Sequence, residues 1–462
     1  MIFCNNPFKK VHLDPGGGVR VCSWTDESIG NVLKEDFKEI WHGEKANKIR
    51  ESIMDGSYKY CRAISCPYLE NDSLPDIDGE ELEREKIPTE VPVSYSVACD
   101  FTCNHSCPSC RDEVFCGSKE YKENLEKELD IILPYLQKAE NIVTCGNGDI
   151  FSSKQMMDML EKLKPENKDC KIQFETNGAL FDEKRWDRIK HLGEYELLVT
   201  ITPNSFEEHT FKYLNGGHDS LKEVLHNLAF IKELKSKGMV NEIEISMVMQ
   251  DRNFWELPDF ARRCIEEFDA DRVVVKPLYK WFNLSEDNYW HKDVLNPLHP
   301  YHAEYLEMIK DPYLQNNDKV FFWGANNLHP AQKHPAYRYK EQLDIISRLV
   351  DCKNLNVRLK KYFENLNVSK LYIYGDMEIS SIIYNILSEA IEIEAFIARD
   401  IKRKQICGLD VISVCDYTCK PDDVILVLNY PFFANIKRDF DFAGFTGRLI
   451  RLDDLVDTVL EQ

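Results

Sequence analysis

The sequence predicts an α/β protein whose central domain is a partial, TIM-like (βα)6 barrel. Strand-like and helix-like segments alternate six times between residue 91 and about residue 279. The helix-like segments, such as KEYKENLEKELDIILPYL (119–136), are amphipathic and rich in Lys and Glu. This alternation is typical of parallel strands joined by crossover helices, and six repeats are too few to close an eight-stranded barrel.

The ends of the predicted strands are where function is expected. The six strand candidates are residues 91–98, 141–146, 171–177, 196–202, 242–249 and 272–279. Ligands of parallel α/β sheets bind at the carboxyl ends of the strands. We therefore expect the functional residues to follow these segments directly.

Further domains flank the barrel. Residues 1–75 form a cysteine-punctuated domain, 76–90 have the acidic composition of a linker, 91–310 form the barrel, and 311–365 connect the barrel to a C-terminal domain. A second α/β pattern over 366–462 predicts that this last domain is small and Rossmann-like. Its first turn, Gly375–Ser380, has only the first glycine of G-x-G-x-x-G, so a structural or docking role and a nucleotide site both stay open.

Composition narrows the class of protein. The chain has 462 residues, 43 % hydrophobic and 30 % charged, with a formal net charge of -21. That charge argues against broad binding to nucleic acid or anionic lipid, which requires clustered Lys and Arg. The opening MIFCNNPFKK has no apolar core of signal-peptide length, and no run is long enough to span a membrane. We expect a cytoplasmic protein that binds neither nucleic acid nor a membrane.

Cysteines are numerous and concentrated toward the N-terminus. Sixteen cysteines in a protein of a reducing compartment favour metal or cluster ligation over a disulfide framework. Cys103, Cys107 and Cys110 follow the first predicted strand with the spacing C-x3-C-x2-C. Three thiolates on one loop can bind three corners of a [4Fe-4S] cluster and leave the fourth iron open. The alternative is a structural zinc site completed by Cys99 or Cys116.

This loop resembles the signature of the radical S-adenosylmethionine (radical SAM) superfamily. The resemblance covers roughly residues 91–280 and implies that Cys103, Cys107 and Cys110 ligate a [4Fe-4S] cluster that binds S-adenosylmethionine. It further implies reductive cleavage of that cofactor to a 5′-deoxyadenosyl radical, which abstracts hydrogen from a substrate. Ser109 departs from the pattern, because the family usually has an aromatic residue there.

Loops after the next strands resemble other parts of the same family. Glycines after the second strand leave backbone groups free to meet the cofactor, and a TNG sequence follows the third. The resemblance implies cofactor contacts from Gly146, Asn147, Gly148, Asp149, Thr176, Asn177, Thr202 and Asn204. A simple β-turn is the alternative for the Gly146–Asp149 stretch.

The N-terminal cysteines resemble a SPASM-type auxiliary cluster domain, here preceding the barrel. Cys4, Gly17 and Cys22 give C-x12-G-x4-C. With Cys61 and Cys66 they imply four ligands for one auxiliary [4Fe-4S] cluster, saturated by thiolates and suited to electron transfer. A Cys4 zinc site and unliganded buried cysteines are the alternatives.

The leading hypothesis is a radical SAM enzyme, of oxidoreductase type, that oxidises or rearranges a sugar or small metabolite. We expect an electron donor such as flavodoxin or ferredoxin as partner. A peptide-modifying maturase is the alternative enzyme. A non-catalytic zinc- or cluster-binding scaffold and a simple electron-transfer protein are the alternatives from other classes.

Overall fold

The computed structural model divides into two compact units. The first comprises Met1–Met54 and Tyr58–His334, and the second Asp55–Ser57 and Pro335–Gln462. The structure describes residues 2–461 except 26, 62–65, 71–72, 145–146, 280–285, 324–334, 377, 399–400, 402, 415, 419, 429–432, 434–435, 438–439 and 441–444. Within these residues no helix is long and apolar enough to cross a membrane.

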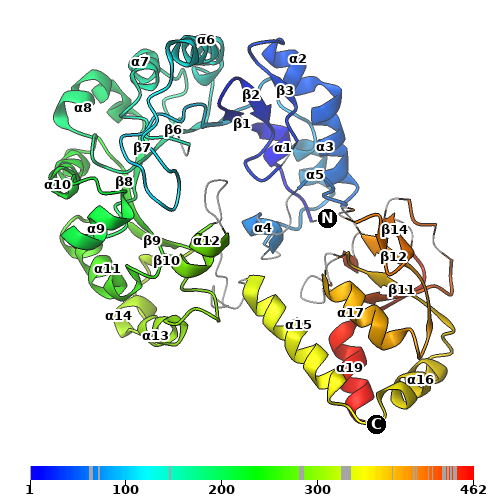
Figure 1. Ribbon diagram of the computed structural model, residues 1–462. Helices are drawn as coiled ribbons and strands as arrows, with labels where there is room; N and C mark the ends of the chain where they lie inside the picture. Colours follow the sequence, from blue (N-terminus) through cyan, green and yellow to red (C-terminus); the bar gives the residue numbers. More distant parts are fainter. Residues whose placement is uncertain are drawn as a thin grey trace. The chain divides into compact units, whose positions relative to one another are not determined.

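Six parallel strands form the centre of the first unit, in the order in which they occur in the chain (Figure 1). They are β4 (Ser94–Val97), β5 (Asn141–Thr144), β6 (Lys171–Thr176), β7 (Glu196–Ile201), β8 (Glu242–Val248) and β9 (Arg272–Lys276). All six lie within the strands expected from the sequence, most of them one to three residues shorter. The α/β class with a large parallel sheet is thus confirmed.

Helices follow the strands and lie outside the arc that the strands form in Figure 1. They are α6 (Lys119–Leu136), α7 (Lys154–Lys162), α8 (Glu183–Ile189) with η1 (Lys190–Glu194), α9 (Glu208–Leu214), α10 (Leu221–Ser236), η2 (Phe254–Glu256) and α11 (Leu257–Glu266). Side-chain caps fix the start of the first three. Ser118, Ser153 and Asp182 each accept a hydrogen bond from a backbone N–H of the first turn.

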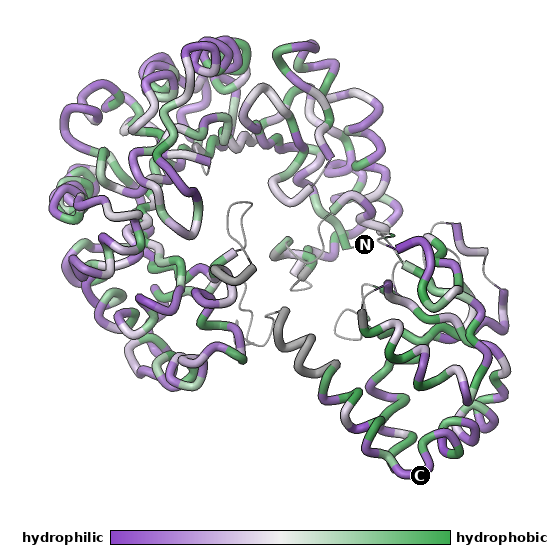
Figure 2. The backbone as a smooth tube through the Cα atoms, viewed as in Figure 1, coloured by the Kyte–Doolittle hydropathy of each residue, from purple (hydrophilic) through white to green (hydrophobic). Residues whose placement is uncertain are grey.

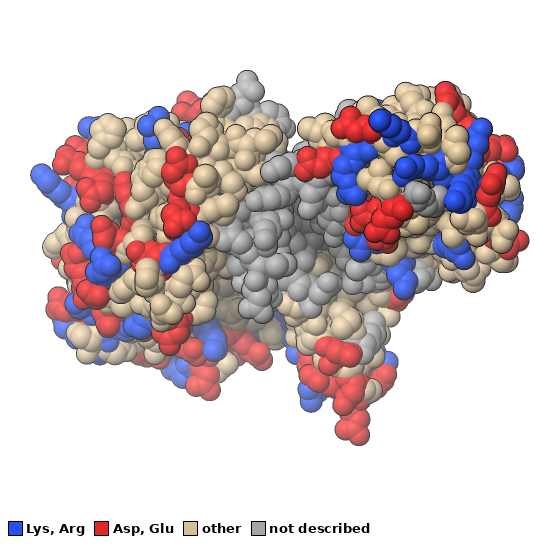
Figure 3. All heavy atoms as spheres, turned by 90° about the horizontal axis from the view of Figure 1, so that it is seen from below, with Lys and Arg blue, Asp and Glu red and all other residues tan. Residues whose placement is uncertain are grey.

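Aromatic packing joins the sheet to the segments that precede α7 and α8. Phe174 of β6 lies 5.8 Å, ring centroid to centroid, from Phe151, which stacks on Phe181 at 4.6 Å. Figure 2 shows hydrophobic strands beneath helices whose outer faces are hydrophilic. On the face drawn in Figure 3, basic and acidic side chains are interspersed. Ion pairs of this kind include Arg188 with Asp158 at 2.8 Å and with Glu161 at 2.7 Å.

The N-terminal segment continues the same sheet, which the sequence did not reveal. Its elements are α1 (Asn6–Lys9), β1 (Lys10–Asp14), β2 (Gly18–Arg20), β3 (Gly30–Asn31), α2 (Phe37–His42), α3 (Glu44–Met54), α4 (Pro67–Glu70) and α5 (Gly79–Glu85). β1 pairs in parallel with β4, so the sheet crosses the boundary expected near residue 75. The stretch expected to be a linker holds α5, which has no buried residue.

The opposite end of the sheet gains a short strand from the expected connecting segment. The elements after β9 are α12 (Glu286–Lys292), α13 (His302–Met308), α14 (Pro312–Gln315) and β10 (Val320–Phe322). β10 pairs in parallel with β9, which completes a ten-stranded sheet with β3 at its other edge.

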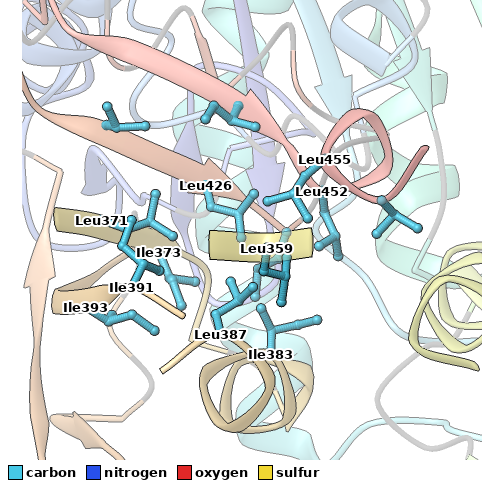
Figure 4. Packing of buried hydrophobic residues seen from close by; sticks show 14 of the residues in the cluster. Leu359, Leu371, Ile373, Ile383, Leu387, Ile391, Ile393, Leu426, Leu452 and Leu455 are labelled. Atoms are coloured by element: carbon cyan, nitrogen blue, oxygen red, sulfur yellow. The ribbon is translucent and has the colours of Figure 1, made fainter. Parts of the chain in front are cut away.

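The second unit is another α/β structure. It contains α15 (Pro335–Val350), α16 (Leu355–Asn365), β11 (Lys370–Tyr374), α17 (Glu378–Leu387), β12 (Glu392–Ala398), β13 (Gln405–Ile406), β14 (Leu409–Ser413), β15 (Val424–Val427), β16 (Arg448–Arg451) and α19 (Leu452–Glu461). Its strands lie in the order β13-β14-β12-β11-β15-β16, and all but β13 are parallel. Leucine and isoleucine side chains from strands and helices pack together beside this sheet (Figure 4).

Candidate radical and cluster site

The three cysteines of the C-x3-C-x2-C motif lie on the long loop between β4 and α6. A turn forms within it, because the backbone N–H groups of Cys110 and Arg111 both donate to the carbonyl of Cys107, at 2.8 and 2.9 Å. Burial raises the pKa of the Cys107 thiol to about 12, with smaller contributions from Cys110 and Cys103. The three sulfur atoms are therefore close enough to act on one another electrostatically.

Glycine allows the loop after β5 to approach the cysteine loop. A Cβ atom on Gly148 would overlap the carbonyl oxygen of Thr102, so a larger residue there would separate the two loops. The N–H of Asp149 donates to the same carbonyl at 2.8 Å. Asn147 adds a side-chain hydrogen bond of 2.7 Å to the carbonyl of Ala98, at the end of β4. Gly146, expected to contact the cofactor, lies outside the described residues.

Asp149 joins the ends of β5 and β6. Its carboxylate accepts hydrogen bonds from the Thr176 hydroxyl at 2.7 Å and from the backbone N–H groups of Asn177 and Phe151 at 2.8 and 3.0 Å. Complete burial raises the pKa of this carboxyl, and the hydrogen bonds oppose that shift. Three donors around one buried carboxylate make Asp149 a positioning residue for the TNG turn.

The TNG turn in turn contacts the cysteine loop. The Asn177 amide donates to the side chain of Asn104 at 2.8 Å, and its nitrogen lies 4.0 Å from the Cys103 sulfur. Five of the expected cofactor contacts, from Asn147 to Asn177, are thus brought together around the three cysteines.

Two other expected contacts lie at the same edge of the sheet with different partners. The Thr202 hydroxyl shares a hydrogen bond of 2.7 Å with Ser246. Asn204 adopts a left-handed conformation (φ 66°), and its side-chain oxygen accepts from the N–H of Val248 at 2.9 Å. The oxygen of Asn204 therefore links the ends of β7 and β8.

Sequence reasoning missed two residues that touch the thiols. Arg111 donates to the carbonyl of Phe101 at 2.6 Å, to that of Asn147, and toward the Cys110 sulfur at 3.7 Å. Asn215, at the end of α9, lies 3.4 Å from the Cys107 sulfur. The role of Arg111 could have been predicted, because this basic residue directly follows the last cysteine of the motif. No local sequence feature predicts the contact of Asn215.

The far side of the cysteine loop is anchored by histidines. His105 is buried, hydrogen-bonds Ser220 at 2.8 Å and stacks on His218 with ring centroids 5.3 Å apart. Burial, with a smaller effect of His218, lowers the pKa of His105 to about 4. His105 therefore acts as a neutral anchor of the loop.

The N-terminal cysteines also converge. Charges on Cys22 and Cys66 both influence Cys4, whose pKa burial raises to about 12. Cys61 and Cys4 pack against the apolar cluster that contains Cys66. The four thiols expected to hold an auxiliary cluster therefore share one region of the fold. Among the described residues, no group of three or more His, Cys, Asp or Glu could hold a single metal ion.

The two cysteines considered for a zinc alternative differ in their surroundings. Cys99 is 1 % exposed and hydrogen-bonds the buried Glu128, whereas Cys116 is exposed. The donor set of the loop is thus three thiols at the carboxyl edge of a parallel sheet, which fits three corners of an iron–sulfur cluster. Fold and site together define an α/β protein with an iron–sulfur type of cysteine loop.

Comparison with known families identifies the protein further. Residues 101–264 match the Radical SAM superfamily, and residues 4–67 match SPASM, an iron-sulfur cluster-binding domain. The chain therefore carries a radical SAM domain, and a SPASM domain precedes it in the sequence. The radical SAM domain implies a [4Fe-4S] cluster and S-adenosylmethionine, and the SPASM domain implies auxiliary iron–sulfur ligation.

A comparison with solved structures found, among others, structures of Streptococcus suis SuiB. SuiB bound to S-adenosylmethionine is 14 % identical, with a TM-score of 0.35, over 63 % of this chain and 64 % of SuiB. SuiB bound to the precursor peptide SuiA is 14 % identical, with a TM-score of 0.34, over 68 % and 70 % of the two chains. The chain thus spans slightly less than two thirds of the first of these relatives.

Proposed function

We propose that this enzyme binds its [4Fe-4S] cluster through Cys103, Cys107 and Cys110 and uses S-adenosylmethionine to abstract hydrogen from a polar substrate. The observation that carries the proposal is the convergence of the loops after β5 and β6 on these cysteines through Gly148, Asp149 and Asn177. When bound, cluster and cofactor together supply a 5′-deoxyadenosyl radical.

The chain's own residues hold and orient the cofactor. Asp149 fixes the TNG turn and places the Asn177 amide beside the loop. We assign cofactor contacts to Gly146, Asn147 and Gly148 after β5, and to Thr176, Thr202 and Asn204 at the ends of β6 and β7. Arg111 places a positive charge beside the Cys110 sulfur.

The N-terminal thiols would hold one auxiliary [4Fe-4S] cluster, with Cys4, Cys22, Cys61 and Cys66 as ligands. Four thiolates saturate a cubane, so this site suits electron transfer. That role is consistent with net oxidation of the substrate and with flavodoxin or ferredoxin as the electron donor.

The finer description of the folds belongs to the same proposal. The six strands β4–β9 with their outer helices support a partial (βα)6 barrel. In the second unit the parallel strands lie in the order third, second, first, fourth and fifth of the parallel set, which supports a Rossmann-like domain.

The substrate proposed is a sugar or other small polar metabolite, because the sheet face opposite the helices carries charged and hydroxyl side chains. Examples are Glu175, Thr200 and Lys276 on β6, β7 and β9. A peptide is the alternative substrate.

Anaerobic reconstitution tests the proposal. The wild type should bind about eight irons per chain, and the Cys103→Ala/Cys107→Ala/Cys110→Ala variant about four. A control with the exposed Cys407 changed to Ala should match the wild type. Zinc in place of iron, or unchanged iron in the triple variant, would contradict the cluster assignment.

A further inference from the structure

The face of the large sheet that points away from the helices is polar. Along β6, Ile172, Phe174 and Thr176 are buried, and Phe174 packs against aromatic rings beneath the helices. Because successive strand residues point to opposite faces, Gln173 and Glu175 lie on the other side, called here the inner face.

Hydrogen bonds confirm which residues share the inner face. The Gln173 amide donates to the Thr200 hydroxyl at 3.1 Å, and that hydroxyl lies 3.5 Å from Glu244. Strand pairing places Glu175 beside Thr200, and Glu244 beside Arg272. Pairing of β9 with β8 also sets Lys276 on this face, two residues beyond Val274. At the other end of the sheet, Lys10 of β1 pairs with Ser94 of β4.

Among the described residues, Glu175 differs from its neighbour Glu244 in having no hydrogen-bond or ion-pair partner. Glu244 lies 3.5 Å from Arg272 and next to Thr200. No hydrogen bond or ion pair within the described part of the chain involves the side chains of Glu175, Lys276 or Lys10. Burial raises the pKa of Glu175, the charges of Lys276 and Lys10 lower it, and Glu244 raises it. Glu175 is thus close enough to both lysines to be influenced by their charges, without a direct ion pair to either among the described residues.

Unpaired charges on a half-buried surface cost free energy, since they lose hydration and gain no direct partner. Such groups are retained where a ligand supplies the missing partner. Two ammonium groups and one carboxylate suit a ligand with an anionic oxygen group and a nearby hydrogen-bond donor.

We propose that Lys10, Glu175 and Lys276 form the substrate-binding site of the inner face and select a small hydroxy-carboxylate, such as a sugar acid. The lysines bind the substrate carboxylate and Glu175 accepts a hydrogen bond from a substrate hydroxyl. This assignment rests on the proposed function, since it names the substrate class of the same site.

The positions of these residues suit that role. Glu175 immediately precedes Thr176 and Asn177, which lie beside the cysteine loop. Burial raises the pKa of the Cys4 and Cys22 thiols, and Lys10 is near enough to both for its charge to oppose that rise. A substrate held between Glu175 and Lys10 therefore lies between the proposed radical site and the proposed auxiliary cluster.

The test uses the reconstituted full-length enzyme with S-adenosylmethionine present and D-glucuronate as the probe. Equilibrium dialysis should show that the wild type binds D-glucuronate in preference to D-glucose and D-glucosamine. Lys276→Met and Glu175→Gln should each weaken binding about tenfold or more, as expected for hydrogen bonds to charged groups. Lys276→Arg keeps the charge and should retain most of the affinity. The exposed Lys237, which pairs with Glu233, provides the control Lys237→Met.

Iron content and binding of S-adenosylmethionine are measured on the same samples. If the wild type lacks either, the proposed function is wrong. If both are normal but D-glucuronate does not bind, or the Glu175→Gln and Lys276→Met variants bind it as the wild type does, only the substrate site is wrong. Equal binding of D-glucose would contradict the role of the lysines, and equal loss in Lys237→Met would show a non-specific charge effect.

Discussion

The two α/β units use their parallel sheets differently. In the first unit the helices cover one face, and strand β6 alternates between buried and partly exposed residues. In the second unit every residue of β15 is buried, because apolar clusters cover both faces: Leu426 belongs to one and Ile425 to the other. Parallel strands covered on both sides are continuously hydrophobic, whereas a face left without helices can carry polar chemistry. The difference agrees with the placement of the proposed site in the first unit.

The largest expected effect on stability comes from comparing substitutions on the two faces of β6. Phe174→Ala removes a fully buried ring from the helix side and should lower the local stability of the strand by about 3–5 kcal/mol. Gln173→Ala, one residue earlier on the inner face, should cost only about 1 kcal/mol, mainly its hydrogen bond to Thr200. Native-state hydrogen exchange of the β6 amides measures both. Similar losses at the two positions would show that the inner face is packed like a core.

The second unit should lack this alternation. Leu426 and Ile425 are adjacent in β15 and both are fully buried, so Leu426→Ala and Ile425→Ala should each cost about 2–5 kcal/mol. Hydrogen exchange of the β15 amides reports the loss, and iron content of the reconstituted protein serves as the control. A large loss at one position only would indicate that one face of this sheet is free.

These contrasts show what the sequence could supply. Alternation in KIQFET and the uninterrupted run in VILV are local signals, so the strands and the α/β class were predictable. The cysteine spacing likewise predicted that the three thiols share one loop. The parallel pairing of β1 with β4 was not predictable, because it joins residues more than eighty positions apart through backbone hydrogen bonds. The proximity of Lys10 to Glu175 depends on that pairing. The contact of Asn215 with Cys107 was not predictable either, because it joins residues 108 positions apart.

On the helix-covered side of the first sheet, one of the buried residues that is not apolar is Glu128 of α6. It should make the stability of this unit depend on pH. This carboxylate is 1 % exposed, accepts a hydrogen bond of 2.9 Å from Gly17 and has its other oxygen unsatisfied. Burial raises the pKa of Glu128 to about 8. The folded protein therefore keeps the group protonated where the unfolded chain ionises it, above pH about 4.5.

The contribution of protonated Glu128 to the free energy of unfolding is fully present below about pH 4.5 and is lost as the pH rises toward 8. Glu128→Gln should remove this dependence, so that the stability difference between variant and wild type shifts in favour of the variant as the pH rises. Denaturation followed from pH 5 to 8 measures it. A pH-independent difference between the two proteins would mean that Glu128 is ionised in the folded state.

The smallest expected effect on stability concerns Thr202, which lies at the carboxyl edge of the sheet. Thr202 and Ser246 share a hydrogen bond of 2.7 Å across β7 and β8, and Ser246 is fully buried. Thr202→Val should cost about 1 kcal/mol of local stability, because it leaves the Ser246 hydroxyl without that partner. Thr202→Ser keeps the hydroxyl and is the matched control. If Thr202 serves only to join the strands, both variants will bind S-adenosylmethionine as the wild type does. A loss of cofactor affinity in Thr202→Val alone, with hydrogen exchange of β7 unchanged, would instead show that the hydroxyl contacts the cofactor.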